Sequence, residues 1–396
     1  MGLDDVLDEV GNVVPNGIGA GRQIMGGGGD DRIEGTGGSD DILADPVSPD
    51  DRGGDDQVWG YGGDDRIYGF GGDNRLDGGP GDDELVTADG RDVLLGGPGN
   101  DEMQSGRNTD LLHGGPGNDE VRGGEGDDAL YGDEGNDRVI GSSGDDLIYG
   151  GLGNDQLEGR EGADRFAWSG ASEGRDTILD YELGIDDFVL GDFLRGFSGG
   201  VADLARHVRF ASSAGSSVLQ VNADSSGSTS WHTLADVAGR TGLSAAALYN
   251  VGDLTLDGHP PAHAFAPLAY VASYDDLIKA IGTDSLAAKQ HYLMSGYTEG
   301  RTVSFDGLQY IASYGDDLCD ALGVDATAGA QHFIRFGRAE GRDKDSFDEV
   351  QYVANYKDLQ IAFGTDYDAA TRHYIEHGHA EHRTDQPLSA ATDFIV

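Results

Sequence analysis

The chain has 396 residues, and 73 acidic against 26 basic side chains give a formal net charge of −47, which excludes nucleic-acid binding through a basic face. The only cysteine, Cys319, excludes an internal disulfide, and no apolar run approaches the roughly 18 residues of a membrane span. The start of the chain lacks the basic and apolar regions of a signal peptide, so we expect no cleavable amino-terminal signal.

A nine-residue repeat follows an expected amino-terminal cap of residues 1–25. From residue 51 to residue 167 the frame Gly-Gly-x-Gly-x-Asp-x-U-x, with U apolar, runs through 13 copies, as in residues 96–104 and 114–122. Position six is Asp in 12 of the 13 copies and Asn74 in the other, while position eight is always apolar. Two more copies, residues 26–34 and 35–43, precede an insertion at 44–50 that we expect to form a loop.

The spacing within each copy predicts a short strand and a tight turn. The end of a copy, such as residues 65–68, alternates as a strand requires, and the glycines suit a turn with positive φ and close backbone approach. Stacked as parallel coils, these turns place the aspartates in rows with carbonyl oxygens between them. A cage of oxygen ligands with several carboxylates favours calcium over magnesium, zinc or copper.

This stretch resembles the RTX, or hemolysin-type, calcium-binding repeats, which form a parallel β-roll. The resemblance implies two nonamers per turn, with ions shared between copies two apart, and it covers residues 26–167. It implies these metal ligands: Asp31, Asp40, Asp56, Asp65, Asp83, Asp92, Asp101, Asp110, Asp119, Asp128, Asp137, Asp146, Asp155 and Asp164. Weak sites are expected near the departures from the pattern, which are Asn74, Asn108, Thr36, Thr109 and Ala163.

The alternative for this acidic, glycine-rich stretch is a disordered linker, which is the better description without calcium. We therefore expect the roll to be unfolded at submicromolar calcium and folded at millimolar calcium.

Residues 168–258 are expected to form a β-rich cap, because 176–181 and 186–190 alternate like strands where the nonamer pattern stops after Phe166. The region resembles the target domain of proteins exported by type I secretion. The tail, residues 387–396, ends in Asp393-Phe394-Ile395-Val396 and resembles the terminal export motif of secreted RTX proteases. The resemblance implies an ABC export machinery as partner and an extracellular location.

After a linker at His259-Pro260-Pro261, residues 265–386 predict three helical repeats of about 41 residues. Tyr-x-Ala-x-Tyr segments recur at 270–274, 310–314 and 352–356, and segments from His to Arg recur at 291–301, 332–342 and 373–383. Gly282 and Gly296 are expected to end helices. The repeats resemble those appended to some extracellular RTX-type proteins, and protein binding, surface association and simple capping all remain open.

A histidine cluster in the third copy is a candidate transition-metal site, formed by His373, His377, His379 and His382. His373 recurs as His291 and His332, which favours a packing role for that position.

No catalytic residues are predicted. The segment Gly196-Phe197-Ser198-Gly199-Gly200 matches a nucleophile pattern, but the doubly wound sheet that this motif needs is not predicted around it. In the enzymes that the roll resembles, the catalytic domain precedes the repeats, and only about 25 residues do so here.

The fold class predicted is therefore mixed: a parallel β-roll with a β-rich cap, followed by a small all-α repeat domain. The leading hypothesis is a secreted, non-catalytic calcium-binding protein. The alternatives are a truncated RTX enzyme and a polysaccharide-binding module, with Trp59, Tyr61, Tyr68 and Tyr131 as candidate stacking residues.

Overall fold

The computed structural model describes residues 6–7, 13–14, 23–27, 29–45, 53–191, 201–222, 231–256 and 265–386. The chain divides into two units, Met1–Ala264 and Phe265–Val396, which are described separately. Several predicted features lie outside the described residues: most of the amino-terminal cap, residues 46–50 of the insertion, Gly196–Gly200, the linker at 259–261 and the tail at 387–396. No helix in the described ranges is long and apolar enough to cross a membrane.

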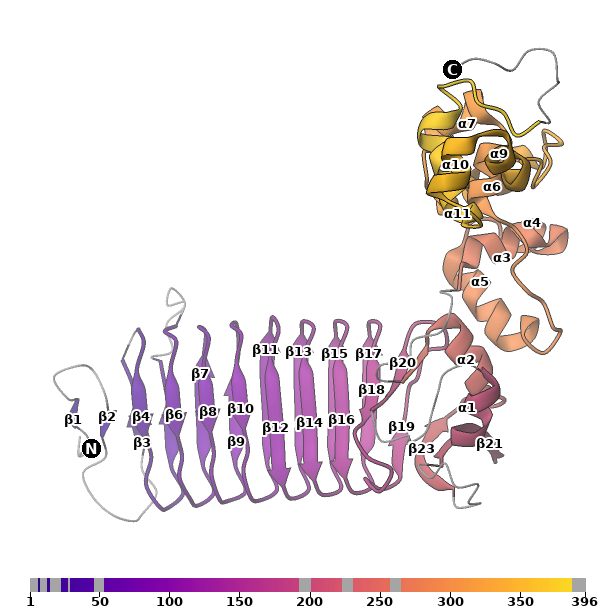
Figure 1. The fold of residues 1–396 in the computed structure, drawn as a ribbon. Coiled ribbons are helices and arrows are strands. Elements are labelled where there is room, and N and C mark those ends of the chain that lie inside the picture. The colour runs from indigo at the N-terminus through magenta and orange to yellow at the C-terminus, as the bar shows by residue number, and fades with distance from the viewer. Residues whose placement is uncertain are drawn as a thin grey trace. The chain divides into compact units, whose positions relative to one another are not determined.

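A parallel β-solenoid forms most of the first unit, from Gln23 to Leu190 (Figure 1). The chain adds one strand to each of two sheets per coil, and within the described ranges each sheet has 12 strands. The solenoid strands of sheet A are β4 (Arg32–Glu34), β6 (Gln57–Trp59), β8 (Arg75–Asp77), β10 (Val93–Leu95), β12 (Leu111–Pro116), β14 (Ala129–Glu134), β16 (Leu147–Leu152), β18 (Arg165–Trp168) and β20 (Asp187–Leu190). Those of sheet B are β3 (Gln23–Met25), β5 (Asp41–Leu43), β7 (Arg66–Phe70), β9 (Glu84–Thr87), β11 (Glu102–Arg107), β13 (Glu120–Glu125), β15 (Arg138–Ser143), β17 (Gln156–Glu161) and β19 (Asp176–Ile178). Short strands β1 (Val6–Leu7) and β2 (Val13–Val14) precede them in sheet A.

The register confirms that two nonamers make one coil. In sheet A, Leu94 pairs with Leu112, and Leu112 pairs with Leu130, each 18 residues further along the chain. These position-eight side chains are fully buried between the two sheets, so each coil adds one apolar layer from each sheet to a continuous core.

The solenoid continues past residue 167, where the clean repeat was expected to stop. Strand β19 pairs in parallel with β17, and β20 pairs in parallel with β18. The reason is that Gly174, Asp176 and Ile178 keep the spacing of repeat positions four, six and eight, as do Gly184, Asp186 and Phe188.

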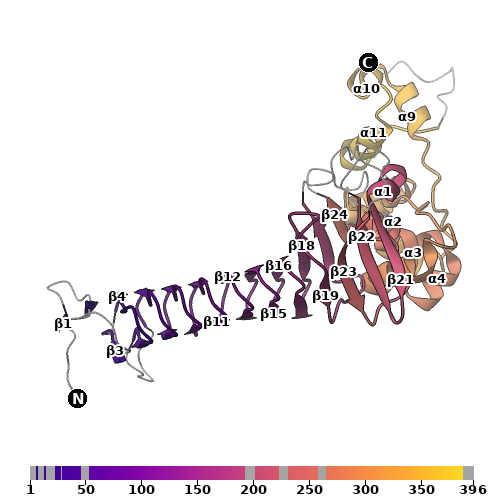
Figure 2. The ribbon, with the colours of Figure 1, turned by 90° about the horizontal axis from the view of Figure 1, so that it is seen from below.

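A β-rich cap follows the last coils, as predicted. Antiparallel strands β21 (Val208–Ser213), β22 (Ser216–Val221) and β23 (His232–Ala238) extend sheet B beyond β19, and β24 (Leu254–Leu256) extends sheet A beyond β20 (Figure 2). Helices α1 (Val201–His207) and α2 (Ala245–Val251) pack against each other beside these strands. Buried rings of Tyr181 and Phe188, with centroids 4.5 Å apart, close the apolar core at this end.

The second unit consists of three helical repeats, each with three α-helices and one π-helix. The first contains α3 (Pro267–Ser273), α4 (Asp275–Ala280), α5 (Ser285–His291) and η1 (Tyr292–Gly296); the second α6 (Gly307–Ala312), α7 (Gly315–Leu322), α8 (Ala326–His332) and η2 (Phe333–Gly337); the third α9 (Glu349–Asn355), α10 (Lys357–Ala362), α11 (Tyr367–His373) and η3 (Tyr374–Gly378). The equivalent residues Asp284, Asp325 and Asp366 cap the amino termini of α5, α8 and α11 with their side chains, which starts each of these helices at the same point.

Gly282 follows α4 with a φ of 64°, and Gly296 is the last residue of η1, so helices end at both glycines as predicted. A Cβ on Gly296 would collide with the hydroxyl of Tyr270. That hydroxyl lies 3.0 Å from Nδ1 of His291. The same Tyr, His and Gly positions recur as Tyr310, His332 and Gly337, and as Tyr352, His373 and Gly378.

Candidate metal centre

The position-six aspartates form two rows along the solenoid, one preceding the strands of each sheet. Each row is buried, because the side chain turns inward at the end of the glycine turn. Asp119, for example, accepts a hydrogen bond at Oδ1 from the backbone N–H of Asp101, one coil earlier, at 2.8 Å. Its own N–H donates to Oδ1 of Asp137, one coil later, at 2.8 Å. From Asp56 onward, one carboxylate oxygen of each position-six aspartate is thus used to join neighbouring coils.

The second oxygen, Oδ2, has no hydrogen-bond partner in the described part of the chain, although it is buried. This holds for the following residues: Asp56, Asp65, Asp83, Asp92, Asp101, Asp110, Asp119, Asp128, Asp137, Asp146, Asp155 and Asp164. A buried carboxylate oxygen without a donor is costly, so a row of them calls for a cation.

The glycine at position one creates the space for this oxygen. A Cβ on Gly114 would meet Oδ2 of Asp119 and the carbonyl oxygen of Gly132 from the next coil. A carboxylate oxygen and a carbonyl oxygen therefore converge where the side chain is missing. Within the described ranges no three His, Cys, Asp or Glu side chains gather in a metal-binding arrangement. The donors that fit are carboxylate oxygens supplemented by backbone carbonyls, the hard oxygen set that calcium prefers.

The pKa values show how poorly the rows tolerate their own charge. Burial raises the pKa of Asp101, Asp137 and Asp146 to about 8, and the charges of neighbouring aspartates add to the rise. Burial raises the pKa of Asp56 and Asp128 to about 7 in the same way. A bound cation lowers these pKa values, because it favours the ionised carboxylates.

Three positions in the rows differ from this arrangement. Oδ2 of Asp31 accepts from the N–H of Gly27, and Oδ2 of Asp40 accepts from the N–H and hydroxyl of Thr36. At Asn74, the amide nitrogen donates to the carbonyl of Gly72 at 3.1 Å. At these three positions, hydrogen bonds to other protein groups therefore take the place of the unpaired Oδ2 found in the rest of the rows.

Two aspartates that the sequence analysis did not include close the rows at the other end. Oδ1 of Asp176 accepts from the N–H of Asp155, and its Oδ2 accepts from the indole of Trp168 at 2.7 Å. Asp186 likewise accepts from the N–H of Asp164 and from the N–H of Glu182. The Gly-x-Asp-x-apolar spacing at these two places was the signal available in the sequence.

A second ladder at position five was also missed. The Oδ1 atoms of Asn100 and Asn118 accept from the N–H groups of Asn118 and Asn136, one coil later, at 2.9 and 2.8 Å. The recurrence of Asn or Asp before the position-six Asp is visible in the printed sequence. This ladder is exposed to solvent, so it joins coils without creating an unpaired buried charge.

Comparison with known families agrees with this geometry. The family model of the RTX calcium-binding nonapeptide repeat (4 copies) matches residues 23–46, 51–85, 68–103, 77–112, 104–139 and 131–166. These segments of the chain are RTX calcium-binding repeats. They lie in the part of the chain that forms the solenoid, and calcium is the cation that such repeats bind. No curated protein matches the chain.

The histidine cluster of the third helical repeat does not assemble within the described residues. Nδ1 of His373 lies 2.9 Å from the hydroxyl of Tyr352, a contact that the other two repeats share. Nε2 of His379 lies 3.0 Å from Oδ1 of Asp320 in the preceding repeat. His373 and His379 therefore serve packing within and between the repeats.

The four candidate stacking residues lie apart. Trp59 packs under Arg32 on sheet A, Tyr61 lies in a turn with a φ of 72°, and Tyr68 on sheet B donates to Glu84. Tyr131 instead belongs to an aromatic row on the outer face of sheet A.

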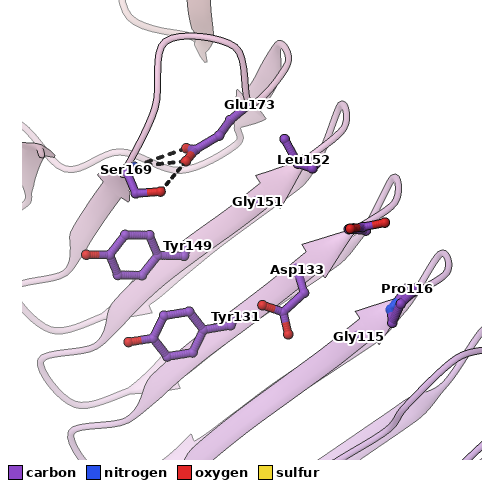
Figure 3. Close-up of a pocket in the computed structure, with 10 residues that line it drawn as sticks. Gly115, Pro116, Tyr131, Asp133, Tyr149, Gly151, Leu152, Ser169 and Glu173 are labelled. Atoms are coloured by element: carbon purple, nitrogen blue, oxygen red, sulfur yellow. Dashed lines mark hydrogen bonds between the residues drawn. The ribbon is translucent and has the colours of Figure 1, made fainter. Parts of the chain in front are cut away.

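That row borders a groove of about 630 Å³ (Figure 3). The ring of Tyr131 stacks on His113 at 4.4 Å and on Tyr149 at 5.0 Å, with 7° between the planes in both pairs. Asp133 and Glu173 line the groove as well, with Asp133 3.0 Å from His113 Nδ1 and Glu173 bonded to Ser169. The groove combines aromatic rings, phenol hydroxyls and carboxylates. The other lining residues are Gly115, Pro116, Glu134, Gly151, Leu152 and Ser169.

Proposed function

We propose that this chain is a secreted, non-catalytic calcium-binding protein whose solenoid folds when the chain meets extracellular calcium, and whose helical repeats bind a protein partner or the cell surface. The observation that carries the proposal is the double row of twelve buried Oδ2 atoms that have no hydrogen-bond partner among the described residues. These twelve aspartates are the proposed ligands. Asp31 and Asp40 are proposed as terminal ligands, and their Oδ2 atoms must give up the hydrogen bonds from backbone N–H groups in order to bind the ion.

The size of the effect is sufficient for a folding switch. A site with a dissociation constant near ~10⁻⁴ M contributes about 1.4 kcal/mol at about 1 mM calcium. About ten such sites contribute on the order of 15 kcal/mol, which is comparable with the stability of a whole domain. At submicromolar calcium this contribution vanishes and the charge repulsion within the rows remains.

A calcium titration of the chelator-treated chain, followed by circular dichroism, tests this function. We expect a cooperative coil-to-β transition between about 0.1 and 1 mM calcium, with no equivalent transition in magnesium or zinc. A solenoid that is already folded in chelator, or that ignores calcium, contradicts the proposal.

Export is proposed to follow the type I route, with residues 168–258 as the target region and 387–396 as the terminal signal. The support is that low cytosolic calcium leaves the solenoid unfolded, as passage through a narrow exporter requires. The test is secretion from cells carrying a type I exporter. A chain whose last ten residues are replaced by a Gly/Ser sequence should stay inside the cells, whereas the natural chain should appear in the medium. Equal secretion of both chains contradicts this route.

Glycan binding is a second candidate function, favoured by the groove beside Tyr131 and Tyr149. Carboxylates at Asp133 and Glu173 oppose anionic glycans, so the ligand expected is a neutral or amine-bearing saccharide. Calorimetry with neutral, amine-bearing and uronate oligosaccharides tests this. Tyr131→Ala should abolish binding, whereas Tyr68→Ala on sheet B should not. Binding of uronates alone, or equal binding by both variants, contradicts it.

A further inference from the structure

The three helical repeats stack through one recurring contact. Helix α8 of the second repeat packs on α3 of the first, and α11 of the third packs on α6 of the second. Polar contacts accompany the stacking. Arg338 pairs with Asp275 of the first repeat at 3.1 Å, and His379 lies 3.0 Å from Asp320 of the second. The first helix of a repeat is therefore the surface that receives the next repeat.

In the third repeat this receiving surface is exposed. The equivalent residues Leu268, Leu308 and Val350 are 3%, 8% and 50% exposed. On the same helices, Ala272 and Ala312 are buried, and the third equivalent, at residue 354, is exposed.

The next helix of each repeat follows the same trend. Ile278 and Cys319 are nearly buried in the first two repeats, and the equivalent residue of α10, Gln360, is exposed. Beside it, Ile361 is 79% exposed, the highest value among the exposed large apolar side chains of the described chain. We call the surface formed by Val350, Ala354, Gln360 and Ile361 the open face (α9 and α10 in Figure 2). Apolar exposure of this kind marks an interaction surface.

We propose that the open face is an interface between two copies of this chain related by a twofold axis. In the first two repeats the residues equivalent to Val350, Ala354 and Gln360 are buried where another repeat of the same kind packs, so a second copy of this chain offers a partner of the same chemistry. The residues equivalent to Ile361, which are Lys279 and Asp320, are exposed, so Ile361 extends the apolar surface beyond the part that the repeats cover. A twofold arrangement places each open face on the other, and such self-complementary contacts are the commonest form of homodimer.

Charge supports the twofold arrangement. Glu349 begins α9 and Lys357 begins α10, at the border of the open face, and no ion pair within 4.0 Å involves either side chain in the described chain. A twofold axis between the two helices brings Glu349 of one copy towards Lys357 of the other.

Head-to-tail growth is less favourable, because it would use α5 of the first repeat. The positions of α8 and α11 that are buried against the preceding repeat hold Ala330 and Thr371, and the equivalent residue of α5 is Lys289. A lysine amine would then be placed against the apolar open face, where its desolvation opposes binding.

The test is the mass of the full chain in about 1 mM calcium, by sedimentation equilibrium over roughly 1 to 100 μM protein. We expect the natural chain to reach twice its monomer mass. Ile361→Asp should weaken dimerisation about 100-fold or more, because a charge would replace an apolar side chain at the contact. Met294→Asp in η1 is the matched control, since Met294 is 65% exposed but lies on the first repeat, and it should leave the dimer intact.

Charge reversal gives a second test that does not depend on the apolar side chains. Glu349→Lys and Lys357→Glu should each weaken the dimer, and the double variant should restore it. A natural chain that stays monomeric at the highest concentration overturns the proposal. So does assembly that continues beyond a dimer, or an Ile361→Asp chain that dimerises as well as the Met294→Asp control. This inference does not depend on the proposed secretion or glycan functions.

Discussion

Each position-six aspartate from Asp56 to Asp164 performs two separate tasks with its two oxygens. At Asp119, Oδ1 accepts the N–H of Asp101 and joins the coils, whereas Oδ2 lies in the space left by Gly114. An asparagine at this position keeps the oxygen that accepts the hydrogen bond between coils, but it replaces the charged second oxygen with a neutral amide nitrogen. Asn74 shows that the solenoid accepts this exchange, because its amide donates to the carbonyl of Gly72.

Asp119→Asn is therefore expected to lower the free energy of unfolding in about 1 mM calcium by about 1 to 3 kcal/mol, through the loss of one ligand to the ions beside it. Urea unfolding at fixed calcium measures the change. In chelator the variant should be no less stable than the natural chain, since it carries one repelled charge fewer.

Asp82→Asn is the matched control, because Asp82 lies in the exposed position-five ladder, where Asn already occurs at residues 100, 118, 136 and 154. It should leave the calcium dependence unchanged. Equal losses for Asp82→Asn and Asp119→Asn contradict the division of tasks between the two ladders.

The position-four glycines are required for a different reason. Gly117 has a φ of 154°, and a Cβ there would collide with the carbonyl of Gly99 in the preceding coil. Gly117→Ala should lower the free energy of unfolding by about 3 kcal/mol or more, from backbone strain and collision together.

Gly215 offers the comparison, because it has a φ of 84° but nothing within 4 Å of its missing Cβ. Gly215→Ala should cost only about 1 kcal/mol. Urea unfolding in saturating calcium measures both changes in the free energy of unfolding. Equal losses for the two variants would mean that the positive φ, rather than the close approach of the preceding coil, makes glycine necessary at residue 117.

At the scale of elements, the carboxylate rows make the calcium-free solenoid sensitive to pH. Burial raises the pKa of Asp101 and Asp146 to about 8 and that of Asp119 and Asp164 to about 6, against about 3.9 in an unfolded chain. Between these values the folded solenoid binds more protons than the unfolded chain, so its stability falls as pH rises.

In chelator, lowering the pH from about 8 to 5 should therefore increase the β content. Circular dichroism in chelator at a series of pH values measures this effect. A metal-free chain that loses β structure on acidification over this range contradicts the assigned pKa directions.

The π-helices of the helical unit depend on one close contact. In the second repeat the hydroxyl of Tyr310 lies over Gly337 and 2.9 Å from Nδ1 of His332. Gly337→Ala should be destabilising by about 2 to 3 kcal/mol, and Tyr310→Phe by about 1 kcal/mol through the lost hydrogen bond.

The double variant should be less destabilised than the sum of the two, because removing the hydroxyl relieves the collision with the new methyl group. Thermal unfolding of the four chains completes this double-mutant cycle. Strict additivity would show that the hydroxyl does not require the glycine.

At the scale of the whole molecule, calcium is expected to act on one unit only. The two rows of buried carboxylates lie in the first unit, Met1–Ala264. The second unit is instead held together by recurring aromatic and Tyr–His contacts. In chelator the chain should lose its β signal and keep its helical signal at 222 nm. Limited proteolysis should then spare residues 265–386 and cleave the solenoid. Loss of both signals together would mean that the helical repeats need the folded solenoid.

The sequence by itself determined the solenoid and the chemistry of its rows. The nonamer repeats at a constant spacing, so the contact between Gly114 and Asp119 recurs in the next coil between Gly132 and Asp137. The spacing of the repeat is enough to place those residues. The helical repeats were predictable for the same reason, because Tyr, His and Gly recur at fixed distances along the chain.

Only the tertiary structure decided what happens where a repeat ends. Asp40 and Asp176 are both aspartates of the rows, but their second oxygens are satisfied by Thr36 and Trp168, which no periodicity places there. Likewise, Leu308 and Val350 occupy the same position of the helical repeat, yet one is buried and the other half exposed. The physical reason is that periodic spacing fixes contacts between equivalent residues, whereas burial at an end depends on which segment packs there.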